Sequence, residues 1–433
     1  MRRSKLLTVF VFAPCLALFF TPQGFGDVSP GDVIDKTNWE KAEGLLPEPI
    51  LNWLKNGKVV LDIGELNYDP DVYHPAFALE TMTTNMGKYV LDENDGIADA
   101  KTGKRPRNII GFPFPEIDPK DPKAATKVLY NKTYTQYIAG NVRAVFKAHY
   151  INRSGYSRST IGAMINMVMD GNARSAAKSN PDRVEKYQIF IARSPFDIAG
   201  SAIMTWRYLA PKKEDNTFAY LPAIRRVRRM SPGNRSDTLF GSDMSVDDAS
   251  CYDGKVTAME WKLLRKQEAL LSYNFKEPGR LVKNEDGEWE SSENIKKFRS
   301  GFEKEGWQGA HWAPLDWVWV KQPAYVIEVR AKDPYYNYGT QELWVYEGNC
   351  LPHFKIINDR AGKYWKAVIM AMGIFENRDK EMKLTYAGEQ AVIDERADHA
   401  TLISGPTPTD IWQYDVEMDE DDFSLAGFQK FCK

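Results

Sequence analysis

Residues 201–248 read SAIMTWRYLAPKKEDNTFAYLPAIRRVRRMSPGNRSDTLFGSDMSVDD and form the most distinctive pattern in the chain. Two aromatic runs, at 203–209 and 218–221, flank a polar turn, which predicts a pair of strands. The basic run 225–229 (RRVRR) follows, and the acidic segment 241–248 ends the stretch. We therefore expect a hairpin of a larger sheet that leads into a basic edge and an acidic turn.

The basic run has two interpretations. On a strand, Arg226 and Arg228 share one face, and Arg225 and Arg229 share the other. Guanidinium groups fit carboxylates and phosphates, so these side chains could dock an anion or a partner protein. Alternatively, and favoured here, they form a structural ion network with the nearby acids Asp237, Asp243, Asp247 and Asp248.

The acidic segment also has two interpretations. Ser245 and Asp248 have the spacing of a capping box, which would start a helical turn. Asp243 and Asp247 could instead be a carboxylate pair for glycoside hydrolysis, which needs two carboxyls roughly 5–10 Å apart across a cleft. Close spacing on one loop does not supply opposed faces, so the sequence favours the cap.

Composition and patterning predict a β-rich α+β protein. The chain has 433 residues, of which 43% are hydrophobic and 12% aromatic, and aromatic side chains suit pleated surfaces. Strand patterns recur at 142–151, 163–169, 184–192 and 203–209, and a hairpin is predicted at 341–346 and 353–357. The pattern predicts a large antiparallel sheet with a helix from 122 to before Gly140. Residues 262–276 fit either helix or strand, and we expect a loop at 394–408.

The first 26 residues have the pattern of a secretory signal peptide. Arg2, Arg3 and Lys5 precede an uncharged apolar run at 6–20, and Gly24 and Gly26 permit cleavage before Asp27. The run is about 15 residues long, short of the ~20 that a membrane span needs. An uncleaved anchor is the alternative. No linker-like stretch follows, so residues 27–433 are predicted to form a single domain with an N-terminal helical and loop extension and an acidic tail at 418–422.

The remaining composition excludes several classes of site. The net charge of −2 gives no case for nucleic acid as a partner. The five histidines are scattered, and the cysteines lack zinc-ligand spacing, so we expect no metal, no cofactor and no catalytic residue. Export permits one disulfide, but the sequence does not select its pair from Cys251, Cys350 and Cys432.

Candidate contact residues for a ligand or partner come from the aromatic strands and the central stretch. Single aromatic rings in strands are more often packed core than ligand contacts, and that alternative stays open. The candidates are Trp206, Tyr208, Tyr220, Arg225, Arg226, Arg228, Arg229, Asp243, Trp319 and Trp344.

Several motifs together resemble a bacterial family known only as a domain of unknown function, whose members are long exported proteins related to the outer-membrane lipoprotein-sorting carriers (LolA/LolB-like). The motifs are GDVI at 31–34, GFPFP at 111–115, DPKAA at 121–125, LPAIRRVRR at 221–229, GSDMSVDD at 241–248 and DPYYNYG at 333–339. The resemblance implies a strongly curved antiparallel sheet, like an unclosed barrel, wrapped on helices around an apolar cavity.

This resemblance also implies a function. We expect a periplasmic, non-enzymatic carrier or accessory protein that binds a lipid or another hydrophobic small molecule. Its partner would be a membrane exporter or an outer-membrane protein. Two alternatives stay open at this point: an interaction subunit of a cell-envelope complex, and a carbohydrate-binding or glycoside-hydrolysing protein, which would need exposed, coplanar aromatic rings.

Overall fold

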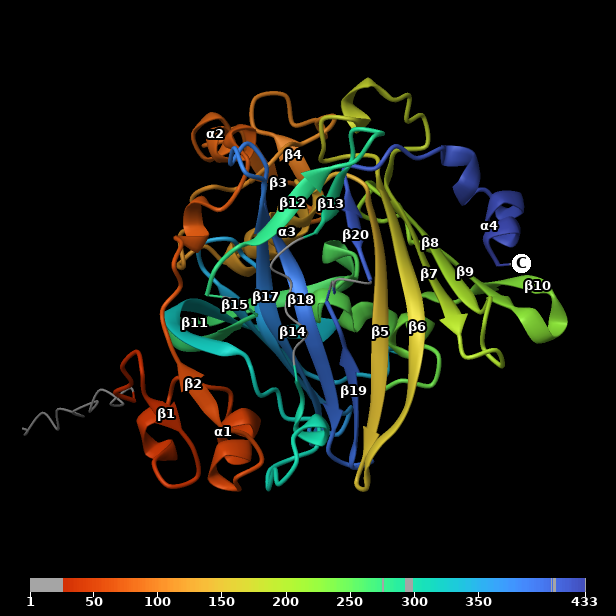
Figure 1. Cartoon of the computed structure of the whole chain (residues 1–433). Coiled ribbons are helices and arrows are strands. Elements are labelled where there is room, and N and C mark those ends of the chain that lie inside the picture. The colour runs from red at the N-terminus through yellow and green to blue at the C-terminus, as the bar shows by residue number, and fades with distance from the viewer. Residues whose placement is uncertain (1–25, 275, 293–298, 406, 408–409, 433) are drawn as a thin grey trace, which may run out of the picture.

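The computed structural model describes residues 26–274, 276–292, 299–405, 407 and 410–432 (Figure 1). The predicted signal peptide lies almost entirely outside these residues. A large, strongly curved sheet dominates the described part, as expected, and among the described residues it contains 18 strands. The prediction from the sequence that residues 27–433 form a single domain stays a prediction.

The N-terminal extension contributes short elements near both ends of the sheet, with β1, α1 and β2 at the bottom of Figure 1 and α2, β3 and β4 at the top. The hairpin of β3 and β4 is separate from the large sheet, whereas β1 pairs with β2, and β2 runs parallel to β14. Their bounds are β1 (Val33–Ile34), α1 (Glu48–Lys55), β2 (Leu61–Ile63), α2 (Ala76–Thr84), β3 (Tyr89–Leu91) and β4 (Ile97–Asp99).

One half of the large sheet is a run of six strands, each antiparallel to the next. All four strands predicted between residues 142 and 209 are present, and the turn after 209 joins β8 to β9 as expected. The strands are β5 (Val142–Asn152), β6 (Gly155–Val168), β7 (Val184–Ser194), β8 (Ala202–Tyr208), β9 (Asn216–Leu221) and β10 (Arg226–Met230).

The other half runs antiparallel from β11 through β14 to β19, which pairs with β5 and joins the halves. The helix-or-strand ambiguity at 262–276 resolves as strand. The predicted loop at 394–408 is wrong, because β19 forms there by pairing with β5 and β18. The strands are β11 (Met259–Tyr273), β14 (Val318–Ala331), β15 (Gln341–Tyr346), β16 (Pro352–Asn358), β17 (Tyr364–Glu376), β18 (Lys383–Asp394) and β19 (His399–Ile403).

Three short strands close a ring within the sheet. β12 (Gly279–Lys283) runs parallel to β17 and pairs with β13 (Trp289–Ser291), which pairs with β20 (Trp412–Tyr414), and β20 pairs with the start of β5. The end of β11 also meets β17 in parallel. The sheet is therefore mixed, although antiparallel pairs dominate it as predicted.

Helix α3 (Ala124–Tyr137) lies inside the curve of the sheet and is buried on every face. Val128, Leu129 and Tyr134 of this helix belong to the largest apolar cluster among the described residues. Asn131 of this helix holds the GFPFP segment, because its side chain accepts from Phe114 N at 2.9 Å and donates to Phe114 O at 2.7 Å. The curved sheet thus wraps around a central helix.

The C-terminal segment covers the outer face of β6 to β9. The four acids of the predicted run, at 419–422, are exposed, and the run leads into helix α4 (Leu425–Phe431), whose N-cap Ser424 accepts from Gly427 N at 3.0 Å. Phe423 and Phe428 pack against outward-facing residues of β6 to β9, such as Met204. Figure 1 shows α4 beside β8, β9 and β10, next to the C-terminus.

Candidate functional site

The segment between β10 and β11 crosses the inner, concave side of the sheet. We call residues 231–253 the inner strap. It contains short 3-10 turns at Pro232–Ser236 and Val246–Cys251. The predicted cap is present in part: Asp248 accepts from Ser245 N at 2.8 Å, in a turn that kinks at Ala249 and Ser250.

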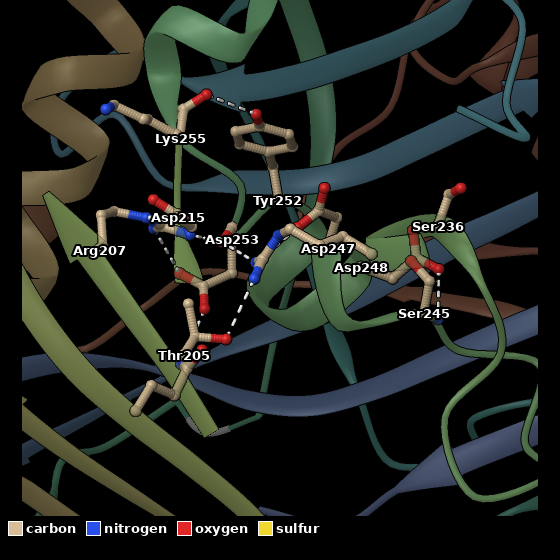
Figure 2. Close-up of polar contacts among 12 residues, drawn as sticks. Thr205, Arg207, Asp215, Ser236, Ser245, Asp247, Asp248, Tyr252, Asp253 and Lys255 are labelled. Carbon is tan, nitrogen blue, oxygen red and sulfur yellow. Dashed lines mark hydrogen bonds and ion pairs between the residues drawn. The ribbon is translucent and has the colours of Figure 1, made fainter. Parts of the chain in front are cut away.

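Buried charges fasten the strap to β8. Arg235 donates to Asp247 Oδ1 at 2.7 Å, to Thr205 Oγ1 at 3.2 Å and to the carbonyl of Asp253 at 3.0 Å. Arg207, also on β8, donates to the same carbonyl at 2.7 Å and to Asp215 at 3.0 Å. Figure 2 shows Thr205, Arg207 and Asp215 gathered around Asp253.

The Asp253 carboxylate extends this cluster to β7. It accepts from Lys186 Nζ at 2.7 Å and from Gln188 Nε2 at 2.8 Å. Burial by itself would raise the pKa of Asp253, but Lys186 and Arg207 outweigh that effect and hold it below the usual range. Burial lowers the pKa of Lys186, and Asp253 opposes that shift.

A second set of buried charges fastens the strap to the other half of the sheet. Asp248 lies 2.8 Å from Lys355 Nζ on β16 and 3.6 Å from Lys366 Nζ on β17. Burial would raise the pKa of Asp248, and the two ammonium groups together lower it. Arg235 and Asp253, on either side of Asp248 in the sequence, tie the strap to β8 and β7. The strap therefore connects both halves of the sheet.

The DPYYNYG motif meets the strap at the same place. Tyr336 donates to Asp247 Oδ2 at 3.0 Å, and Tyr338 donates to Asp248 Oδ2 at 2.7 Å. Two motifs about 90 residues apart in the sequence therefore form one buried cluster. Further along the strap, Asp243 contacts His399 Nδ1 at 2.7 Å and Thr401 Oγ1 at 2.8 Å, which anchors it to β19.

A cavity of about 170 Å³ lies between the strap and the concave face of the sheet. For comparison, an engineered apolar cavity of about 150 Å³ binds benzene. Strands β5, β6, β7, β18, β19 and β20 supply most of the wall, with the end of α3 and the strap across it. The lining includes Val142, Ala144, Phe146, Ala148, Met164, Val168, Phe190, Leu239, Phe240, Met244, Leu351, Ile403 and Trp412.

The wall of the cavity is mainly apolar, with polar groups at one part of it. Met164 and Phe190 are paired across β6 and β7, and the next inward-facing pair along these strands is Asn166 and Gln188. Lys186 and Asp253 also reach the lining. An amphipathic wall of this kind can hold an apolar group and orient it by a few polar contacts.

Three predicted aromatic contacts lie away from this cavity. Trp206, Tyr208 and Tyr220 belong to the outer face that α4 covers, and Trp206 donates to Phe423 O at 2.9 Å. Their neighbours Thr205 and Arg207 face inward. Because side chains alternate along a strand, the aromatic pattern identified the strand but not the face with the cavity.

The four predicted arginines lie on an exposed edge. Arg226, Arg228 and Arg229 belong to β10, which among the described residues pairs only with β9, and Arg225 precedes it with a left-handed backbone. The expected ion network with the nearby acids is wrong for the described residues. Those acids pair elsewhere: Asp247 with Arg235, Asp248 with two lysines and Asp243 with His399.

The other two aromatic candidates are packed core. Trp319 stacks on Phe354 at 6.1 Å between ring centroids, and Trp344 meets the same ring edge-on at 6.2 Å. Both indoles are at most 2% exposed, so they form no exposed binding platform for a sugar.

Asp247 is likewise buried in an ion pair, so the carboxylate-pair interpretation is wrong. None of the ten candidates lines the cavity.

Sequence reasoning missed the buried lysines. Lys355 and Lys366 lie in strongly apolar strands, Lys186 follows Glu185 in the polar first half of β7, and each lysine is at most 3% exposed. A charge inside an apolar run is costly unless a partner neutralises it, so this pattern itself predicts a buried acid nearby. No local feature of the sequence identifies Asp248 and Asp253 as those acids.

The described residues answer three questions that the sequence left open: whether the cysteines pair, whether a helix could span a membrane, and whether a metal could bind. Cys251, Cys350 and Cys432 are free, and burial raises the pKa of each thiol to about 12. The permitted disulfide is therefore not formed among them. Within the described ranges, no helix has both the length and the hydropathy to cross a bilayer, and no acid, histidine and cysteine cluster could hold a metal.

Comparisons with known proteins give a family and distant structural neighbours. Residues 33–429 match the sequence profile of a family described as "Protein of unknown function (DUF1329)". No curated protein matches the sequence. Similar solved structures include a putative outer membrane lipoprotein-sorting protein domain from Vibrio parahaemolyticus and a DUF1329 family protein from Desulfovibrio piger. Each has 15% identity and a TM-score of 0.47, covering 71% of this chain and 100% of that chain. A LolA superfamily protein from Nitrosomonas europaea has 12% identity and a TM-score of 0.41, covering 70% of this chain and 98% of its own.

Proposed function

The chain belongs to the DUF1329 family, and we propose that it is a non-enzymatic carrier or accessory protein that holds a lipid or another hydrophobic small molecule in its inner cavity. The single observation that carries this proposal is the mainly apolar cavity between the sheet and the inner strap. Cavities lined mainly by apolar side chains with a few polar groups are the usual form of small-molecule sites.

The construction of the site supports a binding role. The strap is fastened on both sides by buried ion pairs, so the wall opposite the sheet is fixed without filling the space between them. An unfilled apolar space loses dispersion contacts, and a ligand of matching shape would restore them. These restored dispersion contacts favour the binding of an apolar ligand.

We place the protein in the periplasm, where it would serve a membrane exporter or an outer-membrane protein. The N-terminal pattern of basic residues, apolar run and small residues supports export. An exported carrier of an apolar molecule needs a donor and an acceptor, because its cargo does not leave for water unaided.

Purification from the periplasm, followed by native mass spectrometry and lipid extraction, tests the carrier function. We expect an apolar small molecule to copurify with the wild-type protein. The Ala148→Phe variant, in which an aromatic ring occupies part of the cavity, should copurify without that molecule. Val145→Phe is the matched control, since Val145 lies on the same strand outside the lining. Absence of any copurifying molecule, together with no uptake of added lipid, would contradict the proposal.

The interaction-subunit alternative has one observation in its favour. The edge strand β10 and Arg225 just before it present four exposed arginines beside the exposed apolar residues Leu221 and Ile224. Cross-linking in intact cells followed by affinity capture separates the two functions. A stoichiometric partner protein without a bound ligand would favour the subunit, whereas a bound ligand in the captured protein favours the carrier.

A further inference from the structure

The polar part of the cavity wall contains two acceptor atoms without partners. Asn166 on β6 and Gln188 on β7 occupy paired positions, and both line the cavity. Asn166 Oδ1 and Gln188 Oε1 are buried, and neither accepts a hydrogen bond from any described residue. Buried acceptors normally have a partner, so a pair of unsatisfied ones beside a cavity requires an explanation.

The orientation of the Gln188 amide is fixed by its neighbour. Its nitrogen donates to Asp253 Oδ2 at 2.8 Å, and an ionised carboxylate can only accept. Reversing the amide would set two acceptors against each other. The oxygen of Gln188 is therefore the free end of this group, and the side chain is only 2% exposed.

Asn166 presents the same chemistry on the neighbouring strand. Its nitrogen lies 3.5 Å from the sulfur of Met164, a weak acceptor, and its oxygen has no partner among the described residues. Terminal amide torsions are broad, so a small rotation of the loosely held Asn166 amide turns its oxygen toward a group in the cavity at little cost. Together the two amides offer acceptors to one donor.

The two charged side chains in the cavity lining, Lys186 and Asp253, are paired with each other. The Lys186 ammonium is bound to Asp253 at 2.7 Å, and the nearby Arg207 is bound to Asp215 at 3.0 Å. A carboxylate or phosphate in the cavity would face two amide oxygens and cations that already have anions. A ligand ammonium would find no uncompensated carboxylate in the lining, because Asp253 is already bound to Lys186. The polar part of the wall therefore suits a neutral group.

We propose that the ligand of this cavity carries a neutral hydrogen-bond donor, a hydroxyl or an amide N–H, which binds Gln188 Oε1 and Asn166 Oδ1. Its apolar part lies along the adjoining wall formed by Phe146, Met164 and Phe190. This inference rests on the proposed carrier function and specifies its ligand class: an amphiphile with a neutral, donating head.

Calorimetric titration of the mature protein with three probes tests the inference. The probes are 1-octanol, its isomer 1-methoxyheptane, which keeps the oxygen but has no donor, and octanoate, which is anionic. We expect 1-octanol to bind about tenfold more tightly than the ether, because one hydrogen bond to an otherwise unsatisfied buried acceptor has about that effect. Octanoate is expected to bind more weakly than the alcohol.

The outcomes separate this inference from the carrier function. Equal affinity for 1-octanol and 1-methoxyheptane would overturn the donor-binding wall and leave the carrier function standing. Tightest binding of octanoate would overturn it in favour of an anion site. Failure of all three probes to bind would overturn both proposals.

Variants locate the effect. Asn166→Leu and Gln188→Met each remove one acceptor, and we expect the preference for the alcohol to fall to less than about threefold while ether binding is retained. Ser404→Ala is the control, because this lining hydroxyl already bonds to both the N–H and the carbonyl of Lys147, at 3.1 and 3.2 Å. An unchanged preference in both amide variants, with melting temperatures like the wild type, would overturn the assignment.

Discussion

The two faces of strands β6 to β9 are closed in different ways, although the same strands supply both. The outer face carries apolar residues such as Met204 and Phe218, and the C-terminal segment with α4 covers it mainly by apolar packing. The inner face carries Thr205, Arg207 and Lys186, and the strap closes it with buried polar contacts that include the Lys186–Asp253 ion pair. The outer contact tolerates local loss, because packing is distributed over many atoms. The inner contact does not, because each buried charge depends on a specific partner.

The largest effect is expected from Asp248→Asn on the inner side. The substitution leaves Lys355 and Lys366 buried without an anion, and breaking a buried pair in this way costs about 3–5 kcal/mol. Urea unfolding of the variant and the wild type measures the difference. Asp398→Asn, which breaks the exposed pair with Arg153, is the control and should change stability by less than about 1 kcal/mol. Equal effects of both substitutions would remove the distinction between the faces.

Phe428→Ala on the outer side should have a smaller and more local effect. Phe428 is fully buried, and truncation of a buried Phe costs about 3–5 kcal/mol. We expect the lower end of that range, because a short terminal helix can detach while the sheet stays folded. Limited proteolysis should cut the variant near residues 424–432 first, and 1-octanol binding should be retained. Loss of that binding would show that α4 also supports the inner face.

The acid dependence of stability gives a third test. The folded pKa of Asp248 lies below its unfolded value of about 4, so its contribution is complete above about pH 4 and is lost as the pH falls. Asp248→Asn removes this group. Below about pH 4, unfolding free energy should therefore fall with pH less steeply in the variant, by up to about 1.4 kcal/mol per pH unit. Chemical unfolding at several pH values measures both slopes, and parallel slopes would contradict the role of Asp248.

The smallest effect on stability is expected at the edge of the sheet. Replacement of Arg225, Arg226, Arg228 and Arg229 by serine should change the unfolding free energy by no more than about 0.5 kcal/mol per site, because exposed side chains of this kind contribute little. Urea unfolding again supplies the measurement. A loss of several kcal/mol would mean that these arginines take part in the fold after all.

Much of the fold was predictable because it depends on local patterns. The alternation of apolar residues identified β5 to β9, and the helix predicted from 122 to before Gly140 is α3. Strand β19 was missed, because its five residues have no strong pattern and are held as a strand by β5 and β18. The family motifs were recognised in the sequence, but the contact between the strap and the DPYYNYG motif was not predicted.

The candidate site was less predictable, and Trp206 shows why. The sequence determined by itself that residues 203–209 form a strand with Trp206 and Arg207 on opposite faces, since strand side chains alternate. Only the tertiary structure decided that α4 covers the face of Trp206 and that the face of Arg207 meets Asp253 and the cavity. The periodicity of a strand is a property of adjacent residues. The partner of each face is set by chain segments tens to hundreds of residues away, and nothing in the local pattern specifies it.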